Sequence, residues 1–481
     1  MGIIDEIGSP LGAHLRFLVA DESRYFCARR TGPSAFSPFE RDAGPRSACP
    51  VSPRLHDPRR LDGGSRNMGS GAADVDPPLV AAVRAGDTDL ARSLLLEDDG
   101  PEMLDFAFCL AVGTYSGALA QMLLDHGADP SRCEAEALLP LREAVASGSP
   151  ALCEALLDGR VRNTYSKSEL LDMRDLARRW HETGVETELR RLTGSQGTLV
   201  RTRVQDDEYY SVDEYALGAR TVRDGHAAIL TRLEELLGIR TSFQELMARA
   251  LNHGQDHTAW GNATILLAHR RDQETWAAAA ALRTHPEPAR RLFGAEVLRL
   301  THLLDDSDED AFVGPALDLF IDWSTEEGDV TVLTEVLVAL GDHADPRADA
   351  ALVGYAGPPD ARVRCAVARG LSSWPEPPAF SDDVRETLLV LMTDTDAVVR
   401  QSACLTVAVS RDRDLVFADA MAALLDDADR RVQLVAVYGL ALHDDERCVS
   451  GADRLPSAPP GTPHEHELDA VWRYERRRDS R

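Results

Sequence analysis

The sequence predicts an all-α chain in which two different arrays of helix pairs follow one another. Two observations carry this prediction. An apolar pattern with a turn between two short helices returns four times over 77–192. A D-x-x-V motif followed by a one-sided apolar helix returns four times over 329–440. Such self-similarity is typical of repeat proteins, whose units cannot bury their apolar faces alone.

The first 67 residues differ in composition from the rest. Residues 1–67 hold 10 basic and 8 acidic residues, whereas 68–481 hold 42 basic and 72 acidic residues. The stretch before Met68 is rich in Pro, Gly and Arg and has no sustained period, which is typical of a disordered segment. We interpret 1–67 as a disordered leader or an over-extended gene model with the true start at Met68. A real flexible arm is the alternative.

Four copies of the first pattern lie between residues 77 and 192. Leucines of the second helix mark them, 29, 33 and 37 residues apart: Leu90, Leu119, Leu152 and Leu189. The second copy ends in D-H-G-A-D-P, where Gly127 can take a positive φ and Pro130 prevents the helix from resuming. His126 is therefore expected to belong to a helix end and not to a catalytic site.

A short helix, a Gly-containing turn, a second helix and H-G-A-D-P resemble the ankyrin repeat. The resemblance implies an ankyrin-like repeat domain over 77–192. The second copy departs from the pattern, because Tyr115 stands where the neighbouring copies have glycine. Without that glycine, the pattern does not define the turn between the two helices of the second copy.

Residues 193–227 break the helical period and are expected to form a connector. TLVRTRV alternates β-branched and basic positions, and ALGARTVRDG follows it. This alternation predicts a connector with one small β-hairpin, in which ALGARTVRDG forms either the partner strand, around Gly218, or a turn at Asp224–Gly225.

The second pattern opens each copy with D-x-x-V. Apolar residues follow each valine at i+4 and i+8, so one face of a helix is apolar. The aspartate is suited to accept the free N–H groups of the first turn. The four copies begin at Asp329, Asp360, Asp396 and Asp429, and their valines are 31, 36 and 33 residues apart.

Helix pairs with D-x-x-V-R at the second helix resemble HEAT repeats of the short bacterial, phycobilisome-lyase HEAT-like type. Arg364 and Arg400 occupy the arginine position, and Gln433 departs from it. The resemblance implies a HEAT-like repeat domain over 228–445. Together with the ankyrin-like part it implies a double α-solenoid of the kind found in actinobacterial HEAT/ankyrin repeat proteins. Residues 446–481 are expected to be a Pro-rich linker and a C-terminal tail.

Charge and cysteine usage limit the compartment and the partners. A formal net charge of −28 repels phosphate backbones, so we expect no nucleic-acid partner. Eight scattered cysteines without C-x-x-C spacing predict neither a zinc site nor a disulfide framework. The sequence shows no signal peptide and no apolar run of membrane-spanning length. We therefore expect a reduced, cytoplasmic protein with no membrane partner.

No residue stands out as catalytic, cofactor-binding or metal-binding, and no cofactor is expected. His253 and His257 have the i, i+4 spacing of two metal ligands, but a surface turn is the favoured interpretation because Gly254 and Asp256 weaken a helix there. The run 305–310 lacks the Gly and Glu of a calcium-binding loop. A lyase-like or chromophore- or cofactor-handling enzyme of the HEAT type is the alternative, which only the shared scaffold supports.

The function we expect is a protein-interaction scaffold or adaptor with no chemistry of its own. Residues 301–350 contain 14 acidic residues and one basic residue, Arg347. A dense acidic patch attracts positively charged partners and speeds their encounter. We therefore expect a basic protein partner. The predicted partner-binding residues are Asp305, Asp306, Asp308, Glu309 and Asp310.

Overall fold

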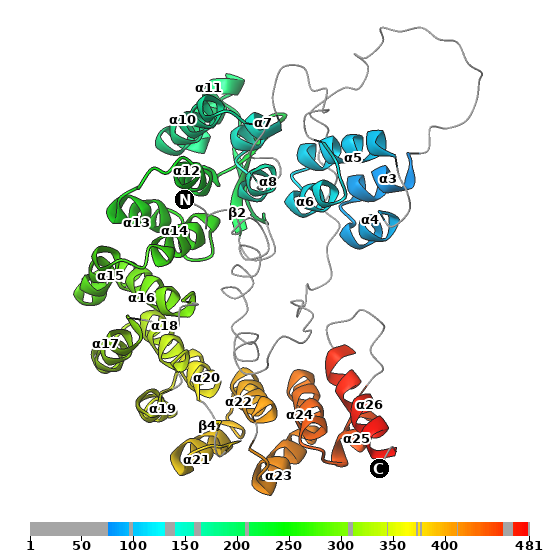
Figure 1. Cartoon of the computed structure of the whole chain (residues 1–481), viewed down its shortest axis with the longest axis vertical. Coiled ribbons are helices and arrows are strands. Elements are labelled where there is room, and N and C mark those ends of the chain that lie inside the picture. Colours follow the sequence, from blue (N-terminus) through cyan, green and yellow to red (C-terminus); the bar gives the residue numbers. More distant parts are fainter. Residues whose placement is uncertain are drawn as a thin grey trace, which may run out of the picture. The chain divides into compact units, whose positions relative to one another are not determined.

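The computed structural model divides the chain into two compact units, whose helices and strands are labelled in Figure 1. The described residues are 76–95, 100–129, 140–157, 165–206, 211–305, 311–343, 345–371, 374–375, 378–410, 412–455 and 465–479. Unit 1 ends at Leu266 and unit 2 begins at Leu267. The helices expected from residue 228 onward are therefore divided between the two units. The leader 1–67 lies outside the described residues.

Unit 1 consists of short helices and one small sheet. Its helices are α3 (Pro78–Ala85), α4 (Thr88–Leu94), α5 (Pro101–Gly113), α6 (Gly117–Asp125), α7 (Pro140–Ser147), α8 (Pro150–Leu156), α10 (Lys167–Thr183), α11 (Val185–Thr193), α12 (His226–Leu236), α13 (Phe243–Leu251) and α14 (Thr258–His269). Asp87 and Ser149 cap α4 and α8 with side-chain hydrogen bonds, as N-cap residues do. Apolar side chains of both helices of each pair form one core cluster.

The turns of the first array follow the predicted chemistry. Gly127 ends α6 with a φ of +99°, and His126 is an exposed C-cap residue whose Nδ1 lies 2.8 Å from the carbonyl oxygen of Met122. The interpretation of His126 as part of a helix end is confirmed. Tyr115 takes the left-handed conformation that glycine has in the neighbouring copies, with a φ of +58°. The uncertain turn of the second copy therefore forms.

The connector is a three-stranded antiparallel sheet and not the single hairpin that we expected. β1 (Val200–Gln205) pairs with β2 (Ser211–Leu217), and β2 pairs with β3 (Arg220–Arg223). We expected the partner strand around Gly218, but Gly218, with a φ of +64°, lies in the turn between β2 and β3. The prediction missed β2 as the partner of β1, because Asp213 and Glu214 interrupt the apolar pattern of this strand.

Unit 2 is a succession of helices in two layers. Its helices are α15 (Gln273–Ala280), α16 (Pro288–Leu303), α17 (Val313–Glu326), α18 (Val330–Gly341), α19 (Pro346–Val353), α20 (Ala361–Gly370), α21 (Asp382–Leu391), α22 (Ala397–Val409), α23 (Leu415–Ala423), α24 (Arg430–Leu442), α25 (Arg447–Ala452) and α26 (Glu465–Asp479). 3-10 turns at Ala281–Thr284 and Leu424–Asp426 follow α15 and α23, and β4 (Trp374–Pro375) pairs with β5 (Pro378–Ala379). The prediction of a mainly helical chain is confirmed.

The D-x-x-V motif starts the second helix of each pair. In all four copies the aspartate side chain accepts a backbone N–H of the first turn, and the valine is fully buried. These second helices, α18, α20, α22 and α24, pack side by side in one layer (Figure 1). The backbones of α18 and α20 are in close contact at Gly341 and Gly370. A Cβ on Gly341 would lie only 2.5 Å from the Cα of Gly370. A larger residue at either position would force these helices apart.

An arginine–carboxylate clamp joins adjacent copies in unit 2. Arg400 donates two hydrogen bonds of 2.7 Å to the two carboxylate oxygens of Asp427 and a third to the carbonyl of Asp394. The hydrogen bond from Arg400 holds the pKa of Asp427 below its ordinary value. Asp427 also accepts the N–H of Asp429, the next N-cap. The same clamp forms between Arg364 and Asp394 and between Arg291 and Glu327, whereas Gln433 reaches only a carbonyl oxygen.

The C-terminal segment is folded where the structure describes it. We expected a linker and tail over 446–481, but α25 and α26 pack against α24. Ala470, Val471 and Tyr474 of α26 are buried and cover the last helix pair. The arginine-rich composition of α26 hid this helix, because its apolar residues are few. Terminal repeats of repeat proteins need such a covering element with a polar outer face.

Two further observations concern the cysteines and the membrane. Cys109 is disulfide-bonded, so the expectation of no disulfide is wrong at this residue. Cys153, Cys365, Cys404 and Cys448 are free thiols. No helix among the described residues is long and apolar enough to cross a membrane.

The register of α22 allows a direct test of the packing. Ala403 is fully buried, whereas Gln401 is half-exposed on the same helix. Ala403→Asp would place an unpaired charge between helices and should lower the free energy of unfolding by on the order of 3 kcal/mol or more. Gln401→Asp, the matched control, should cost less than about 1 kcal/mol. Equal losses in denaturant unfolding of the two variants would show that the register is wrong.

Candidate functional site

The predicted acidic site is only partly described, and its first residue is not free. Asp305 Oδ1 lies 3.0 Å from Nη1 of Arg271, and the Asp305 side chain is only 7% exposed. This carboxylate therefore belongs to an internal ion pair. Asp306, Asp308, Glu309 and Asp310 lie outside the described residues, so their role as partner-binding residues stays a prediction.

Much of the acidic charge of 301–350 is balanced within unit 2. Arg299, which precedes this window in the sequence, lies between Glu335 at 3.3 Å and Asp342 at 2.8 Å. Further pairs are Arg283–Glu326, Arg291–Glu327 and Arg347 with Asp318 and Asp345. The count of charges within the window overstated the free negative charge, because most of the balancing arginines lie outside the window.

Two histidines and an aspartate form a compact cluster in unit 1. Asp224 follows β3, His253 follows α13, and His257 directly precedes α14. His257 Nε2 lies 2.9 Å from Asp224 Oδ1, and His253 Nδ1 lies 3.4 Å from Asp224 Oδ2. His257 is fully buried, so the interpretation of this segment as a surface turn is wrong at His257. The sequence carried no signal of the partner, because Asp224 is distant in the chain.

The hydrogen bonds define the tautomer of His257. Its Nδ1 accepts the backbone N–H of Ala259 at 3.0 Å, so the ring proton lies on Nε2 and is donated to Asp224. Asp224 Oδ1 also accepts the N–H of Asp213 in β2 at 2.8 Å. One carboxylate thus ties the sheet to the turn between α13 and α14.

Asp224, His253 and His257 are the one group of potential metal ligands in the part of the chain that the structure describes, with donor atoms within 4.8 Å of one another. The arrangement does not fit a shared ion. A ligating imidazole normally donates its other N–H, but Nδ1 of His257 already faces a donor. The two rings are stacked, with centroids 4.1 Å apart and planes 14° apart. An ion in the plane of one ring would lie outside the plane of the other.

Burial and hydrogen bonding shift the pKa values at this cluster. Burial alone would raise the pKa of Asp224, but the hydrogen bonds from His253 and His257 outweigh it and hold that pKa well below its ordinary value. Burial lowers the pKa of His257, and the hydrogen bond to Asp224 opposes this only in part. His226, which stacks on Trp180 at 4.8 Å, is fully buried, and burial lowers its pKa to about 3. At neutral pH, Asp224 is therefore an ionised carboxylate, and His226 and His257 are neutral imidazoles.

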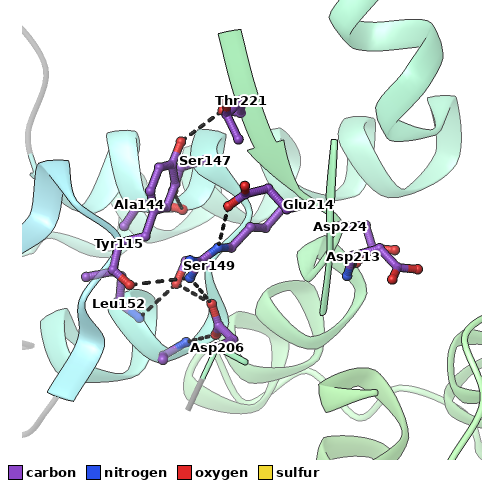
Figure 2. Close-up of polar contacts among 12 residues, drawn as sticks. Tyr115, Ala144, Ser147, Ser149, Leu152, Asp206, Asp213, Glu214, Thr221 and Asp224 are labelled. Carbon is purple, nitrogen blue, oxygen red and sulfur yellow. Dashed lines mark hydrogen bonds and ion pairs between the residues drawn. The ribbon is translucent and has the colours of Figure 1, made fainter. Parts of the chain in front are cut away.

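A second polar network fixes the helix turns of the first array to the sheet (Figure 2). Asp206, at the end of β1, accepts hydrogen bonds of 2.7 Å from the Ser149 hydroxyl, the Ala151 N–H and Arg223 Nη1. The first two of these groups lie at the N-terminus of α8, where a negative charge is stabilised. Asp206 therefore caps a helix that lies more than 50 residues away in the sequence.

Arg223 and Tyr115 complete this junction (Figure 2). The guanidinium of Arg223 lies 4.7 Å from the centre of the Tyr115 ring, and the Tyr115 hydroxyl donates to the carbonyl of Thr221 at 2.9 Å. Gly148 lies so close that an added Cβ would be 1.9 Å from the Arg223 carbonyl oxygen. The connector is thus part of the fold of unit 1.

A small cavity of unit 1, lined by Pro150, Cys153, Ile229 and Thr258, has a volume of only about 10 Å³, which is at the limit for one water molecule. None of its lining residues belongs to either cluster. The fully buried His257 has both ring nitrogens in hydrogen bonds. The hydrogen bonds of Asp224 and His257 therefore stabilise the fold.

Comparisons with known proteins add little. No family model matches the sequence, and no curated protein matches it. Among solved structures, the Escherichia coli protein YibA is similar at 16% identity, with 48% of this chain and 82% of that chain covered and a TM-score of 0.38. A likeness at this level carries no argument about fold or function.

The buried histidines predict a loss of stability in acid. The pKa values of His226 and His257 are lowered in the fold, whereas unfolded histidines protonate near pH 6.5. The unfolded state binds more protons below that pH. The stability of unit 1 should therefore fall by on the order of a few kcal/mol as the pH drops from about 6.5 toward 3.

Thermal unfolding at a series of pH values measures this loss. His226→Asn should flatten the dependence of the melting temperature on pH, because the titrating group is removed. His126→Asn, at the exposed end of α6, is the matched control and should leave the dependence unchanged. An unchanged pH dependence in His226→Asn would contradict the assignment.

Proposed function

We propose that the chain is a protein-interaction scaffold built from two α-solenoids, ankyrin-like and then HEAT-like, with no chemistry of its own. Two features support this proposal. The histidine–aspartate cluster and the Asp206–Arg223 network are buried and engaged in the fold. Successive second helices of unit 2, from α18 to α24, pack side by side, and the extended surfaces of such layers bind partners in repeat proteins.

The observation that carries the proposal is a concentration of exposed apolar side chains in α21, α22 and α23. Leu415 is 75% exposed and Val390 is 58% exposed, and both lie in regular helices of unit 2. Four of the ten large apolar side chains that are exposed in the described part of the chain lie within 390–416: Val390, Val398, Leu415 and Val416. Leu415 and Val416 are adjacent in the chain, and neighbouring exposed apolar side chains are typical of protein-binding sites.

The surface next to Val390 is hollowed and carries charge. Leu389 and Val390 line a shallow groove of about 360 Å³ on α21. Its polar rim consists of Asp382, Arg385, Glu386 and Thr393. Arg385 is engaged by Asp412 and Asp414, so the carboxylates dominate this rim. This charge supports a basic partner, the same partner chemistry that the acidic segment 305–310 suggests.

Affinity capture with the full chain tests the proposal. The immobilised chain should retain a specific protein from the source cells in a saturable way, identified by mass spectrometry. Leu415→Asn combined with Val416→Asn should reduce the retained amount about tenfold, the loss expected when two apolar side chains leave an interface. Phe106→Asn, an equally exposed apolar residue in unit 1, is the matched control and should retain the partner.

The salt dependence of the captured complex tests the charge of the partner. Its association rate should fall as salt shortens the Debye length from about 30 to about 3 Å. Asp306→Asn and Asp308→Asn should flatten this dependence if the acidic segment forms the rim. If the wild type and the double apolar variant retain equal amounts of the partner, Leu415 and Val416 do not belong to the binding surface. Turnover of a bound small molecule by the chain would contradict the proposed scaffold function.

A further inference from the structure

The outer edge of β1 is an open strand edge in unit 1. β1 is the first strand of the sheet order β1–β2–β3, so within the described part of the chain it has a strand neighbour on one side only. Five of its six residues are exposed, and the sixth, Val204, is half-buried. Open edges of this kind accept a further strand through backbone hydrogen bonds.

The register defines which backbone groups face outward. The carbonyl of Asp213 in β2 accepts the N–H of Asp224, so Asp213 points away from β1. The alternate residues of β2 therefore bond β1 through Val200, Thr202 and Val204. The N–H and C=O groups of Arg201, Arg203 and Gln205 point to the open edge. No backbone partner of these groups lies among the described residues.

The side chains beside this edge are basic on one face. Arg201 and Arg203 lie on the same face and share one carboxylate, that of Asp213, which is only 7% exposed. The arginine side chains are 63% and 39% exposed, and Asp213 is the one carboxylate that pairs with them among the described residues. In a chain with a net charge of −28, this is a local exception.

The opposite face of β1 has different chemistry. Val200 is 55% exposed there, and Thr202 is exposed beside it. Glu214, which pairs with Thr202 across the ladder, places a carboxylate on this face. Acidic side chains are therefore favoured on the arginine face and disfavoured on the valine face.

We propose that the open edge of β1 binds an extended acidic segment of a partner protein as a fourth strand. Carboxylates at alternate positions of the segment pair with Arg201 and Arg203, and β-branched residues between them pack beside Val200 and Thr202. The site lies in unit 1 and does not depend on the apolar surface of α21 to α23.

Charge excludes a second copy of this chain as the occupant. Antiparallel pairing of two copies of β1 would bring four arginines together on one face. In the register with Thr202 opposite Thr202, each Arg201 would lie opposite an Arg203 of the other copy. Like charges directly across a ladder are destabilising.

Binding of synthetic peptides to the full chain tests the proposal. The probe is a capped, fluorescently labelled octapeptide of alternating Glu and Val, and the controls are the Lys–Val octapeptide and a block peptide of four Glu and four Val. Fluorescence anisotropy should show the alternating Glu–Val peptide binding about tenfold more tightly than either control. Hydrogen exchange should slow at the amides of Arg201, Arg203 and Gln205 in the presence of this peptide alone.

Two substitutions separate charge from backbone pairing. Arg203→Ala should weaken binding about threefold to tenfold through the lost charge pair. Arg203→Pro should weaken it by a further tenfold or so, because it also removes an outward N–H that the β1–β2 ladder does not use. Unchanged exchange at the β2 amides in both variants would show that the sheet is intact.

Three results would overturn the proposal. The first is that the three peptides bind equally or that none of them binds, which would mean that the arginines serve only to prevent another strand from pairing with this edge. Another is equal binding by Arg203→Ala and Arg203→Pro, which would place the peptide elsewhere. The last is a concentration-dependent dimer that Arg203→Pro abolishes, which would assign the edge to a second copy.

Discussion

A buried carboxylate needs charged or N–H partners, and this requirement organises both units of the molecule. Asp224 is satisfied by two histidines and a backbone N–H, and Asp206 by a serine, a helix N-terminus and an arginine. In unit 2, the Asp427 carboxylate accepts hydrogen bonds from the guanidinium of Arg400 and from the N–H of Asp429, the next N-cap residue. Breaking such a buried pair leaves an uncompensated charge, which is strongly destabilising. The turns between helices are therefore held in fixed positions, and the small apolar residues of the helices can pack around them.

The same requirement uses many ionisable side chains of the described residues within the fold. Asp224 and His257 would form a plausible acid–base pair if they were exposed, but both ring nitrogens of His257 are already hydrogen-bonded. The two surfaces that we propose for binding differ in chemistry: the apolar side chains of α21 to α23 in unit 2, and the arginine-bordered edge of β1 in unit 1.

Local rules predicted the helices well and the tertiary contacts poorly. The D-x-x-V helix starts, the helix end at Gly127 and the burial of Ala403 follow from capping, backbone freedom and helical periodicity, which act within a few residues. The burial of His257, the capping of α8 by Asp206 and the pairing of Asp305 with Arg271 depend on residues distant in the chain. Composition gave a wrong prediction for α26, because arginines surround its few buried apolar residues. Composition also overstated the free negative charge of 301–350, because arginines outside this window pair with its acidic residues.

The central claim is that hydrogen bonds fix the histidine–aspartate cluster as an element of the fold whose geometry does not fit a shared metal ion. Long-range proton–nitrogen NMR spectra of the imidazole rings at neutral pH test it most directly. The account predicts that His257 carries its proton on Nε2 with Nδ1 unprotonated, and that added zinc leaves this pattern unchanged. A proton on Nδ1, or the loss of the Nε2 proton when zinc is added, would contradict the account.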